Sequence, residues 1–207
     1  MRTIIPILIC LISLSCSKTT DQIQTGDIIF RGKLNSQLSA AINDVTQTNK
    51  STNYTHMGIC EVHKDSVIVY HSDLGKGVVA ETLETFLTSS DTSNYSADVY
   101  RIKNREAKRI ENAIVKAKSL IGNTYNTSYI LEDEGYYCSE YIYELFKSDS
   151  IFDLEPMTFK DSKTNEFHNG WIEHYKTLGI EIPEGQLGCN PNGMANSNAI
   201  VFVKKIQ

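Results

Sequence analysis

The sequence predicts an α+β protein in which an antiparallel sheet packs against helices. Short extended segments, separated by glycines or charged turns, follow one another closely enough to pair antiparallel. Amphipathic helical segments flank them, and neither a repeat nor a break in composition marks a second domain. The 207 residues, 41% of them hydrophobic, are enough for one sizeable core. We therefore expect one folded domain over residues 25–207.

The first half of this domain is predicted to be mostly strands. A strand over 26–30 is opened by a turn at Gly26, and apolar spacing over 34–45 predicts an amphipathic helix, followed by a polar loop up to Asn53. The alternation of apolar and polar residues then predicts four further strands, at 56–62, 66–71, 77–81 and 98–102.

Two helices and a final strand are predicted in the second half. Apolar residues from Ala107 to Ile121 recur at helical spacing, and Gly122 is predicted to end that helix in the C′ position. A loop with four tyrosines over 122–137 leads into a helix that begins near Cys138 and reaches Phe146. Residues 149–197 are rich in Asn, Gly and Pro and show no clear pattern, and a strand over 199–203 closes the domain.

The charge balance excludes one class of function. The chain has 20 Lys and Arg against 25 Asp and Glu, a net charge of −5, and no long basic run. Proteins that track nucleic-acid phosphates need a basic face. Nucleic acid is therefore not an expected partner.

The N-terminus has the features of an export signal. A short basic start precedes an apolar run over 4–14, which is too short to span a bilayer as a helix. Small residues then lead to Cys16, which resembles a bacterial lipobox, although Ser13 stands where leucine is usual. We predict a signal peptide at 1–15, a lipid on Cys16, a tether over 16–24, and a protein anchored in the bacterial cell envelope. The alternative is an ordinary secreted protein cleaved nearby.

Three cysteines remain after export: Cys60, Cys138 and Cys189. Since their number is odd, at least one thiol is free within the chain. No C-x-x-C pair indicates a zinc or redox motif. A disulfide between Cys60 and Cys189 is a hypothesis that the sequence alone cannot support further.

Cys138 lies where a polar loop turns into a helix. In a first helical turn, the helix dipole and free backbone N–H groups lower the pKa of a thiol and stabilise an oxyanion. This predicts a nucleophile. The alternative is a small buried residue, the commonest fate of cysteine.

His56 and His71 lie in or beside consecutive strands, where antiparallel pairing would bring their rings together. His56 can then act as the base for Cys138, with His71 fixing its tautomer. Either histidine taken alone is more often a core or surface residue.

The order of several short runs resembles the circularly permuted papain-like cysteine amidases of the YiiX/YaeF type, relatives of the NlpC-type cell-wall endopeptidases. The resemblance extends from about Thr25 to Lys147. The runs that carry it are 26–31, 55–59, 67–71 with 77–79 and 83–87, 122–126 and 136–143. It implies a permuted papain-like fold, with the histidine before the cysteine in the chain.

The resemblance implies roles for individual residues. Cys138 matches the nucleophile and His56 the general base. The third position falls on His71, where many relatives have glutamate, and Glu81 is the second candidate for orienting the base. A neutral imidazole stabilises an imidazolium less than a carboxylate does.

Further cleft residues follow from the same resemblance. Tyr125 matches a tyrosine near the active site, and Asn126 stands where aspartate is common. Asp27 is a candidate near the cleft, or equally a residue of a structural turn, and Ser139 is a cleft candidate beside Cys138. The Pro- and Gly-rich segment 181–191 resembles one that lines the cleft, and Trp171 is either part of that wall or a buried anchor.

Taken together, these features predict a lipid-anchored cysteine amidase or peptidase that acts on envelope peptides through a thioester, with no need for a metal or organic cofactor. One alternative is a lipid acyl hydrolase or acyltransferase of the lecithin-retinol-acyltransferase-like type. The other is a non-catalytic envelope binding lipoprotein, which would have no need of the thiol.

Overall fold

A computed structural model describes residues 22–32, 36–50, 52–88 and 95–207. The predicted signal peptide (1–15), Cys16 and most of the tether lie outside these residues. Within the described ranges, no helix combines the length and the apolar character needed to cross a bilayer.

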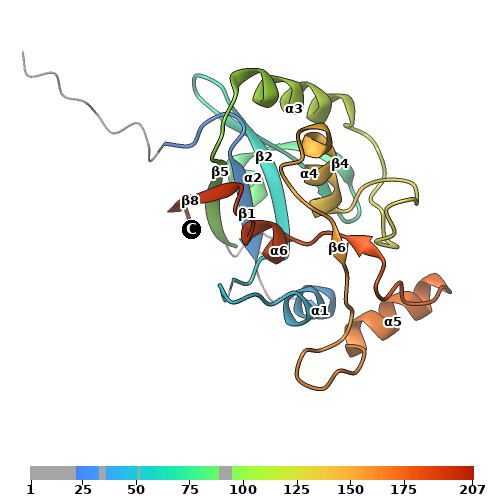
Figure 1. Cartoon of the computed structure of the whole chain (residues 1–207). Helices are drawn as coiled ribbons and strands as arrows, with labels where there is room; N and C mark the ends of the chain where they lie inside the picture. The colour runs from blue at the N-terminus through green and yellow to red at the C-terminus, as the bar shows by residue number, and fades with distance from the viewer. Residues whose placement is uncertain (1–21, 33–35, 51, 89–94) are drawn as a thin grey trace, which may run out of the picture.

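A six-stranded antiparallel sheet is the centre of the domain (Figure 1). Its strand order is β4-β3-β2-β1-β5-β8, so consecutive strands pair on one side of β1 and the C-terminal strand closes the other. The strands are β1 (Ile28–Gly32), β2 (His56–Val62), β3 (Val67–Asp73), β4 (Gly77–Thr82), β5 (Ser96–Ile102) and β8 (Ile200–Lys205). The α+β class and the permuted order of elements are as predicted.

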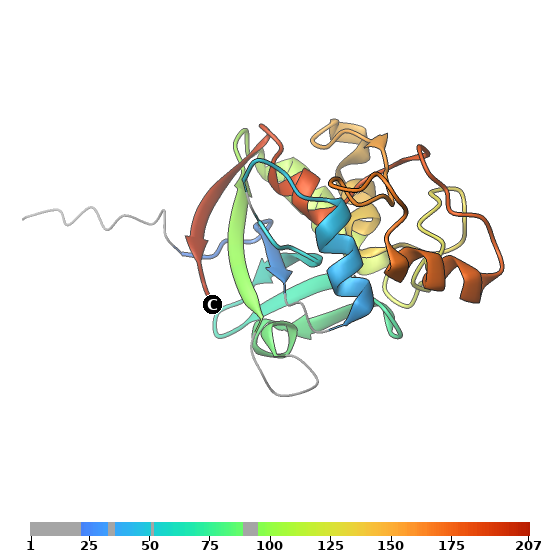
Figure 2. The same cartoon turned by 90° about the horizontal axis from the view of Figure 1, so that it is seen from below.

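The helices lie on different sides of the sheet (Figure 2): α3 and α4 contribute to the buried cluster on one face, and the short α2 contributes to the cluster on the other. The helix that begins at the candidate nucleophile, α4, packs on β2 and β3 and against α3, while α1 and α5 lie side by side at one end of the molecule. The helices are α1 (Gln37–Val45), α2 (Leu83–Leu87), α3 (Ala107–Ser119), α4 (Cys138–Phe146), the 3₁₀ turn η2 (Lys147–Asp149), α5 (Asn169–Leu178) and α6 (Pro191–Ala195).

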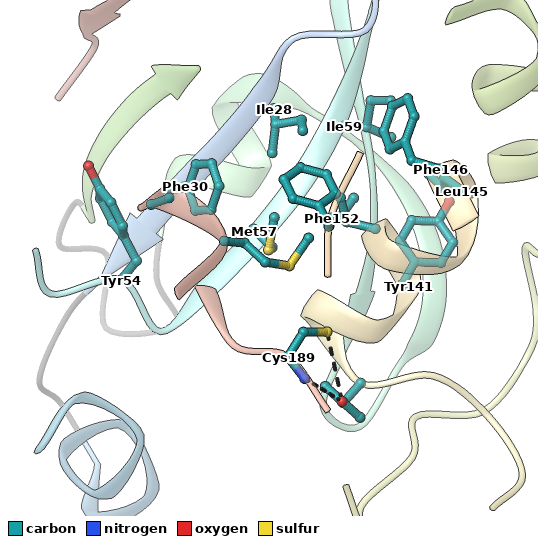
Figure 3. Packing of buried hydrophobic residues seen from close by; sticks show 14 of the residues in the cluster. Ile28, Phe30, Tyr54, Met57, Ile59, Tyr141, Leu145, Phe146, Phe152 and Cys189 are labelled. Carbon is teal, nitrogen blue, oxygen red and sulfur yellow. Dashed lines mark hydrogen bonds between the residues drawn. The ribbon is translucent and has the colours of Figure 1, made fainter. Parts of the chain in front are cut away.

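The alternation of side chains along the strands divides the core into two clusters. Ile28 and Phe30 of β1 join Met57 of β2 on the face that packs against α3 and α4 (Figure 3). Ile29, between them, faces the opposite side with Cys60 and Phe86. Burial on both faces fixes the register of the sheet, because a one-residue slip would exchange the two sets.

The helix predicted over 107–121 is shorter than expected. It ends at Ser119 with Leu120 as its C-cap, and Ile121 is 47% exposed rather than part of the core. Gly122 has a φ of 92° and lies one residue beyond the C′ position of the observed helix, which is Ile121. The apolar pattern alone extends past the point where the backbone leaves the helix.

The expectation that residues 149–197 lack a pattern is wrong. They hold α5, α6 and a small hairpin of β6 (Glu155–Pro156) and β7 (Leu187–Gly188). Local signals set both helices: His168 accepts from Gly170 N and Gly179 ends α5 in the left-handed region, while Asn190 caps α6 ahead of Pro191. These elements are short, and caps define them more clearly than periodicity does.

The hypothesis of a Cys60–Cys189 disulfide is wrong. All three described cysteines are free and buried. Cys60 belongs to the cluster on one face of the sheet, where its thiol donates to Gln24 O, and Cys189 belongs to the cluster on the other face. The sheet separates the two thiols.

Candidate active site

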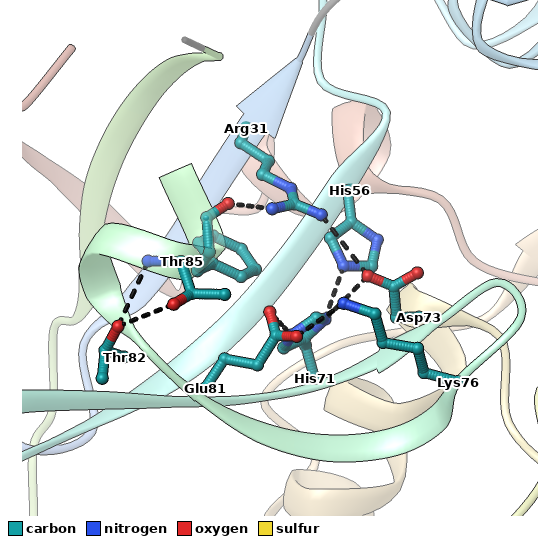
Figure 4. Close-up of polar contacts among 9 residues, drawn as sticks. Arg31, His56, His71, Asp73, Lys76, Glu81, Thr82 and Thr85 are labelled. Atoms are coloured by element: carbon teal, nitrogen blue, oxygen red, sulfur yellow. Dashed lines mark hydrogen bonds and ion pairs between the residues drawn. The ribbon is translucent and has the colours of Figure 1, made fainter. Parts of the chain in front are cut away.

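Two histidines and a glutamate form one hydrogen-bonded chain across three neighbouring strands (Figure 4). His56 Nε2 at the start of β2 lies 2.9 Å from His71 Nδ1 on β3, and His71 Nε2 lies 3.1 Å from Glu81 Oε2 on β4. Lys76 Nζ donates to Glu81 Oε1 at 2.7 Å. His71 and Glu81 therefore act in series rather than as alternatives.

This chain fixes the tautomers of both rings. The hydrogen bond with His71, reinforced by Lys76, lowers the pKa of Glu81 to about 2, so the carboxylate is charged and can only accept. His71 Nε2 must donate to it, which leaves His71 Nδ1 as an acceptor for His56 Nε2–H. The remaining lone pair of His56 is on Nδ1. This nitrogen makes no hydrogen bond with any described residue.

Arg31 is a component of this site that the sequence did not single out. It pairs with His56 in the register of β1 and β2, and its guanidinium is stacked between Phe86, 4.2 Å away, and Tyr95, 4.3 Å away. It also donates to the carbonyl of Phe86 and faces Asp73. The sequence signal that could have indicated a role for Arg31 is a charged residue directly after the apolar run Ile28–Phe30.

Both imidazoles are neutral in this setting. Burial, and then the charge of Arg31, hold the pKa of His56 well below its usual value. Burial also lowers the pKa of His71, which the hydrogen bond to Glu81 only partly offsets. His56 therefore carries a free lone pair at neutral pH, as a general base requires.

Cys138 begins α4, as predicted, and is 4% exposed. The prediction of a lowered thiol pKa is wrong: burial raises the pKa of Cys138 to about 11, although the Ser139 amide and hydroxyl both favour the thiolate. The cost of burying a charged thiolate therefore outweighs the stabilisation that the helix N-terminus gives it. Within the described residues, no hydrogen bond joins the Cys138 sulfur to His56. The charges of Arg31 and Asp73, which flank the histidine pair, nevertheless both change the pKa of this thiol, so the thiol lies near that pair.

Tyr125 lies beside the nucleophile. The backbone amide of Cys138 interacts with its hydroxyl, while burial and neighbouring Tyr129 raise the pKa of Tyr125 well above its usual value. The phenol is therefore protonated and can donate. The Cys138 amide and the Tyr125 hydroxyl thus lie together near the thiol, and N–H and O–H groups are the donors that stabilise an oxyanion.

A buried carboxyl group joins the tyrosine loop to the start of α4. Glu140 Oε2 accepts from Tyr137 N at 3.0 Å and from Asn126 Nδ2 at 3.2 Å. The other end of the Asn126 side chain accepts from Ser128 N and Tyr129 N. Asn126 thus organises the loop that carries Tyr125, which gives this position a structural role.

A cavity of about 620 Å³ opens beside Cys138. Its apolar wall combines parts of the chain far apart in sequence: Ile42 and Val45 of α1, Ile151, Phe152, Met157 and Phe159 before α5, Trp171 of α5, and Met194 of α6. Of the segment 181–191 that was expected to line the cleft, only residues 188–191 do so, and Trp171 also lines the cavity. Asp153 and Glu155 are the charged residues of its lining.

Two further residues that the sequence suggested for the cleft make structural hydrogen bonds. Asp27 is fully buried, does not line the cavity, and accepts from Arg101 Nε and Nη2, both at 2.7 Å. Its surroundings therefore agree with a structural role rather than a role in the cleft. Ser139 does line the cavity, and its hydroxyl donates to Cys189 O at 3.0 Å, which ties α4 to the segment before α6.

One group of atoms has the chemistry of a metal site. His56, His71 and Asp73 each offer a ligand atom, and these three atoms lie within 4.8 Å of one another. Two imidazoles and a carboxylate suit zinc and related transition metals.

Comparisons with known proteins agree with this architecture. A family model described as "Permuted papain-like amidase enzyme, YaeF/YiiX, C92 family" matches residues 22–204. The chain belongs to this family. The resemblance seen in the sequence is thereby confirmed, and the family is one of hydrolases of the papain-like amidase kind.

A solved structure supports the fold of this permuted papain-like amidase. The crystal structure titled "metalloprotein yiiX from Escherichia coli O157:H7" superposes with a TM-score of 0.71. It is 23% identical in sequence, and the match covers 89% of this chain and 98% of that one. No curated protein matches the chain.

Proposed function

We propose that this permuted papain-like amidase hydrolyses amide bonds, and less readily esters, through a thioester on Cys138. One observation carries the proposal: the Glu81–His71–His56 chain ends at a ring nitrogen with a free lone pair, on a strand against which the helix of Cys138 packs. The order nucleophile, base, orienter is that of a cysteine or serine triad, with His71 and Glu81 together as the orienting part.

The reaction begins when His56 Nδ1 takes the thiol proton as Cys138 Sγ attacks the carbonyl carbon. The Cys138 amide and the Tyr125 hydroxyl stabilise the oxyanion. Collapse breaks the C–N bond, and the amine leaves with the proton from His56. Water, deprotonated by His56, then cleaves the thioester, which releases the acid and restores the thiol.

The resting pair is a neutral thiol and a neutral imidazole. The pKa of Cys138 is raised to about 11 and that of His56 is lowered, so the proton stays on sulfur until a substrate is present. Proton transfer therefore accompanies attack, in contrast to enzymes that hold a preformed thiolate–imidazolium pair. Glu81 stabilises the charge that forms on the two rings.

The lining of the cavity indicates which chemical groups of a substrate would fit beside the scissile bond. Its lining is mixed, with a broad apolar wall and the two carboxylates Asp153 and Glu155. An apolar or cationic group beside the scissile bond fits this surface better than an anionic one. Peptides of the bacterial cell envelope are our first candidate. Acyl lipids are the second, favoured by the apolar wall.

Trapping the covalent intermediate tests the proposal. Purified protein is incubated with muropeptides, N-acyl amino-acid amides and activated acyl esters, and the intact mass is measured after acid quench. We expect an acyl adduct that maps to Cys138, with Cys138→Ala abolishing it and His56→Ala slowing its formation by about 10² to 10⁴-fold.

Cys189→Ala is the matched control, because its thiol lines the same cavity. This variant is expected to retain the adduct. An adduct that maps to Cys189, or that forms equally in Cys138→Ala, contradicts the mechanism. Substrate binding without adduct or product would instead support the non-catalytic binding protein.

The YiiX structure bears the word metalloprotein in its title. In this chain the residues that would hold a metal ion are His56, His71 and Asp73, whose donor types fit one. A bound ion would supply Lewis acidity. The steps above are carried by the chain's own thiol, imidazoles and hydroxyl.

We also propose that the protein is located in the bacterial cell envelope, anchored by a lipid on Cys16. It is supported by the apolar run at 4–14 and the small residues before Cys16. Mass spectrometry of the mature N-terminus should show a lipidated Cys16. A chain that starts elsewhere without lipid would exclude the anchor but leave the chemistry intact.

A further inference from the structure

Asp73 is a carboxylate that lacks a close partner. It lies at the end of β3, and the nearest nitrogen atoms that face it are Arg31 Nη2 at 3.8 Å and His71 Nδ1 at 4.0 Å, both beyond hydrogen-bonding distance. Neither oxygen makes a hydrogen bond within the described part of the chain. The side chain is 22% exposed, so water reaches it only in part. The reaction proposed above assigns it no step.

The two imidazole atoms that Asp73 faces are the inner atoms of the catalytic chain. His56 Nε2 and His71 Nδ1 share one proton across 2.9 Å. The outer nitrogen of His71 donates to Glu81, which Lys76 holds in place. A carboxylate behind a histidine is the usual support of a metal-binding imidazole, because it fixes the ring and raises the basicity of the inner nitrogen.

We propose that His56 Nε2, His71 Nδ1 and Asp73 form a reversible site for a divalent transition-metal ion such as Zn²⁺, and that the ion switches the enzyme off. Metal binding by itself is independent of the proposed function. The proposed inhibition does rest on the proposed function, because the ion would block His56, the base of that reaction.

The spacing of the donors is close to what zinc needs. Ligands about 2.0–2.1 Å from a tetrahedral ion lie about 3.3 Å from one another. The three donor atoms lie 2.9 Å to at most 4.8 Å apart, so a small opening of the imidazole pair and a small shift of Asp73 suffice. Arg31 and Lys76 balance the charges of Asp73 and Glu81. The site thus has no excess negative charge, which fits reversible rather than structural binding.

Inhibition follows from the tautomer of His56. In the free protein its proton is on Nε2 and the lone pair is on Nδ1. An ion that binds through Nε2 takes the lone pair there, and the proton moves through solvent to Nδ1. Nδ1 then donates and can no longer accept the proton of Cys138. The ring stays neutral, and no oxidant or other reactant is needed.

Calorimetric titration with Zn²⁺ of the Cys138→Ala variant tests the binding half, because this variant has no nucleophile. We expect one ion per chain, and a Kd that rises at least tenfold when Asp73→Asn is added. Asp44→Asn is the matched control, since Asp44 Oδ2 lies 3.4 Å from His168 Nε2 in a similar pair elsewhere. It should leave the Kd unchanged. An equal effect of both substitutions overturns the site.

X-ray absorption of the zinc-loaded wild type gives a second measurement that needs no Asp73 variant. Two imidazoles and oxygen ligands support the site. Sulfur in the first shell would place the ion on Cys138 and overturn it.

The inhibitory half is tested by acyl-enzyme formation in the otherwise wild-type chain. We expect the Zn²⁺ concentration for half inhibition to match the calorimetric Kd, and to rise by the same factor in Asp73→Asn. Tight binding without inhibition rejects the switch. Absence of acylation even without metal rejects the proposed function, while the binding result stands.

Discussion

At the scale of single residues, the site is governed by the burial of ionisable groups. Cys138 and His56 are both held in their neutral forms, the thiol by desolvation and the imidazole by desolvation and Arg31. In the mechanism proposed above, neither group is charged until a substrate brings a carbonyl to the sulfur. A helix N-terminus is therefore not enough to predict a thiolate, because its effect competes with the cost of burying the charge.

Arg31 provides a test of this electrostatic balance. Replacing it in Arg31→Met keeps an apolar chain between Phe86 and Tyr95 but removes the positive charge beside His56. Since that charge disfavours the imidazolium, its loss should raise the pKa of His56 and shift the acid limb of kcat/KM to higher pH. The histidine ring proton resonances followed by NMR should show the same shift.

Arg105→Met is a suitable control, because Arg105 contacts Gln24 and Thr25 away from the site. Arg31→Lys should restore most of the wild-type profile. An acid limb that stays in place in Arg31→Met, with the fold intact, would show that burial alone sets the basicity of His56.

At the scale of elements, the start of α4 and the tyrosine loop behave as one unit joined by Glu140. Its carboxyl is 5% exposed and accepts from both the backbone before Cys138 and the side chain of Asn126. Burial raises its pKa to about 7. The same residue thus holds together the segments that carry the two proposed oxyanion donors, and its ionised form is disfavoured by burial.

Glu140→Gln separates these two effects. A folded pKa of about 7 against 4.5 for the free group means that its contribution is fully present below pH 4.5 and is lost as the pH rises through about 7. The unfolding free energy of the variant minus that of wild type should therefore increase by roughly 3 kcal/mol between pH 4.5 and pH 8. Urea unfolding at a series of pH values measures it.

Glu134→Gln serves as the exposed control in the same loop and should give a flat difference. Because the amide oxygen of glutamine can replace Oε2 and accept from both Tyr137 N and Asn126 Nδ2, Glu140→Gln should leave kcat and KM close to those of wild type. A flat stability difference would show that the pKa of Glu140 is not raised in the folded chain.

The sequence predicted the elements with strong periodicity and missed those defined by caps. β2 was found with its bounds, and the helix at Cys138 with both ends, because alternation and helical spacing are visible in the letters. α5 and α6 were missed, since a cap such as His168 looks like any loop residue until its partner is known. The His56–His71 contact was foreseen from neighbouring strands, but the roles of Arg31 and Asp73 depend on strand register and on side-chain direction.

At the scale of the whole molecule, the cavity is formed between α1, the start of α4 and a cover built from the C-terminal third. Trp171 and Phe159 of the cover belong to the same buried cluster as Met57 of the sheet and Tyr141 of α4. β8 then returns to pair with β5 at the edge of the sheet. The last strand therefore ties the cover to the body, and the cover shares one of the two buried clusters with the sheet and α4.

Because the cover and the sheet share one buried cluster, we expect them to unfold together, and Trp171 can report on this. It is the only tryptophan, is 3% exposed, and packs against Phe159, Tyr129 and Tyr175 within the cover. Far-UV circular dichroism follows the whole secondary structure, whereas Trp171 fluorescence follows the cover. If the two share one core, both signals should give the same urea midpoint and slope. Trp171→Phe should remove the fluorescence transition and leave that of circular dichroism single. A fluorescence midpoint at clearly lower urea would mean that the cover unfolds first, and that the cavity beside Cys138 opens without loss of the sheet.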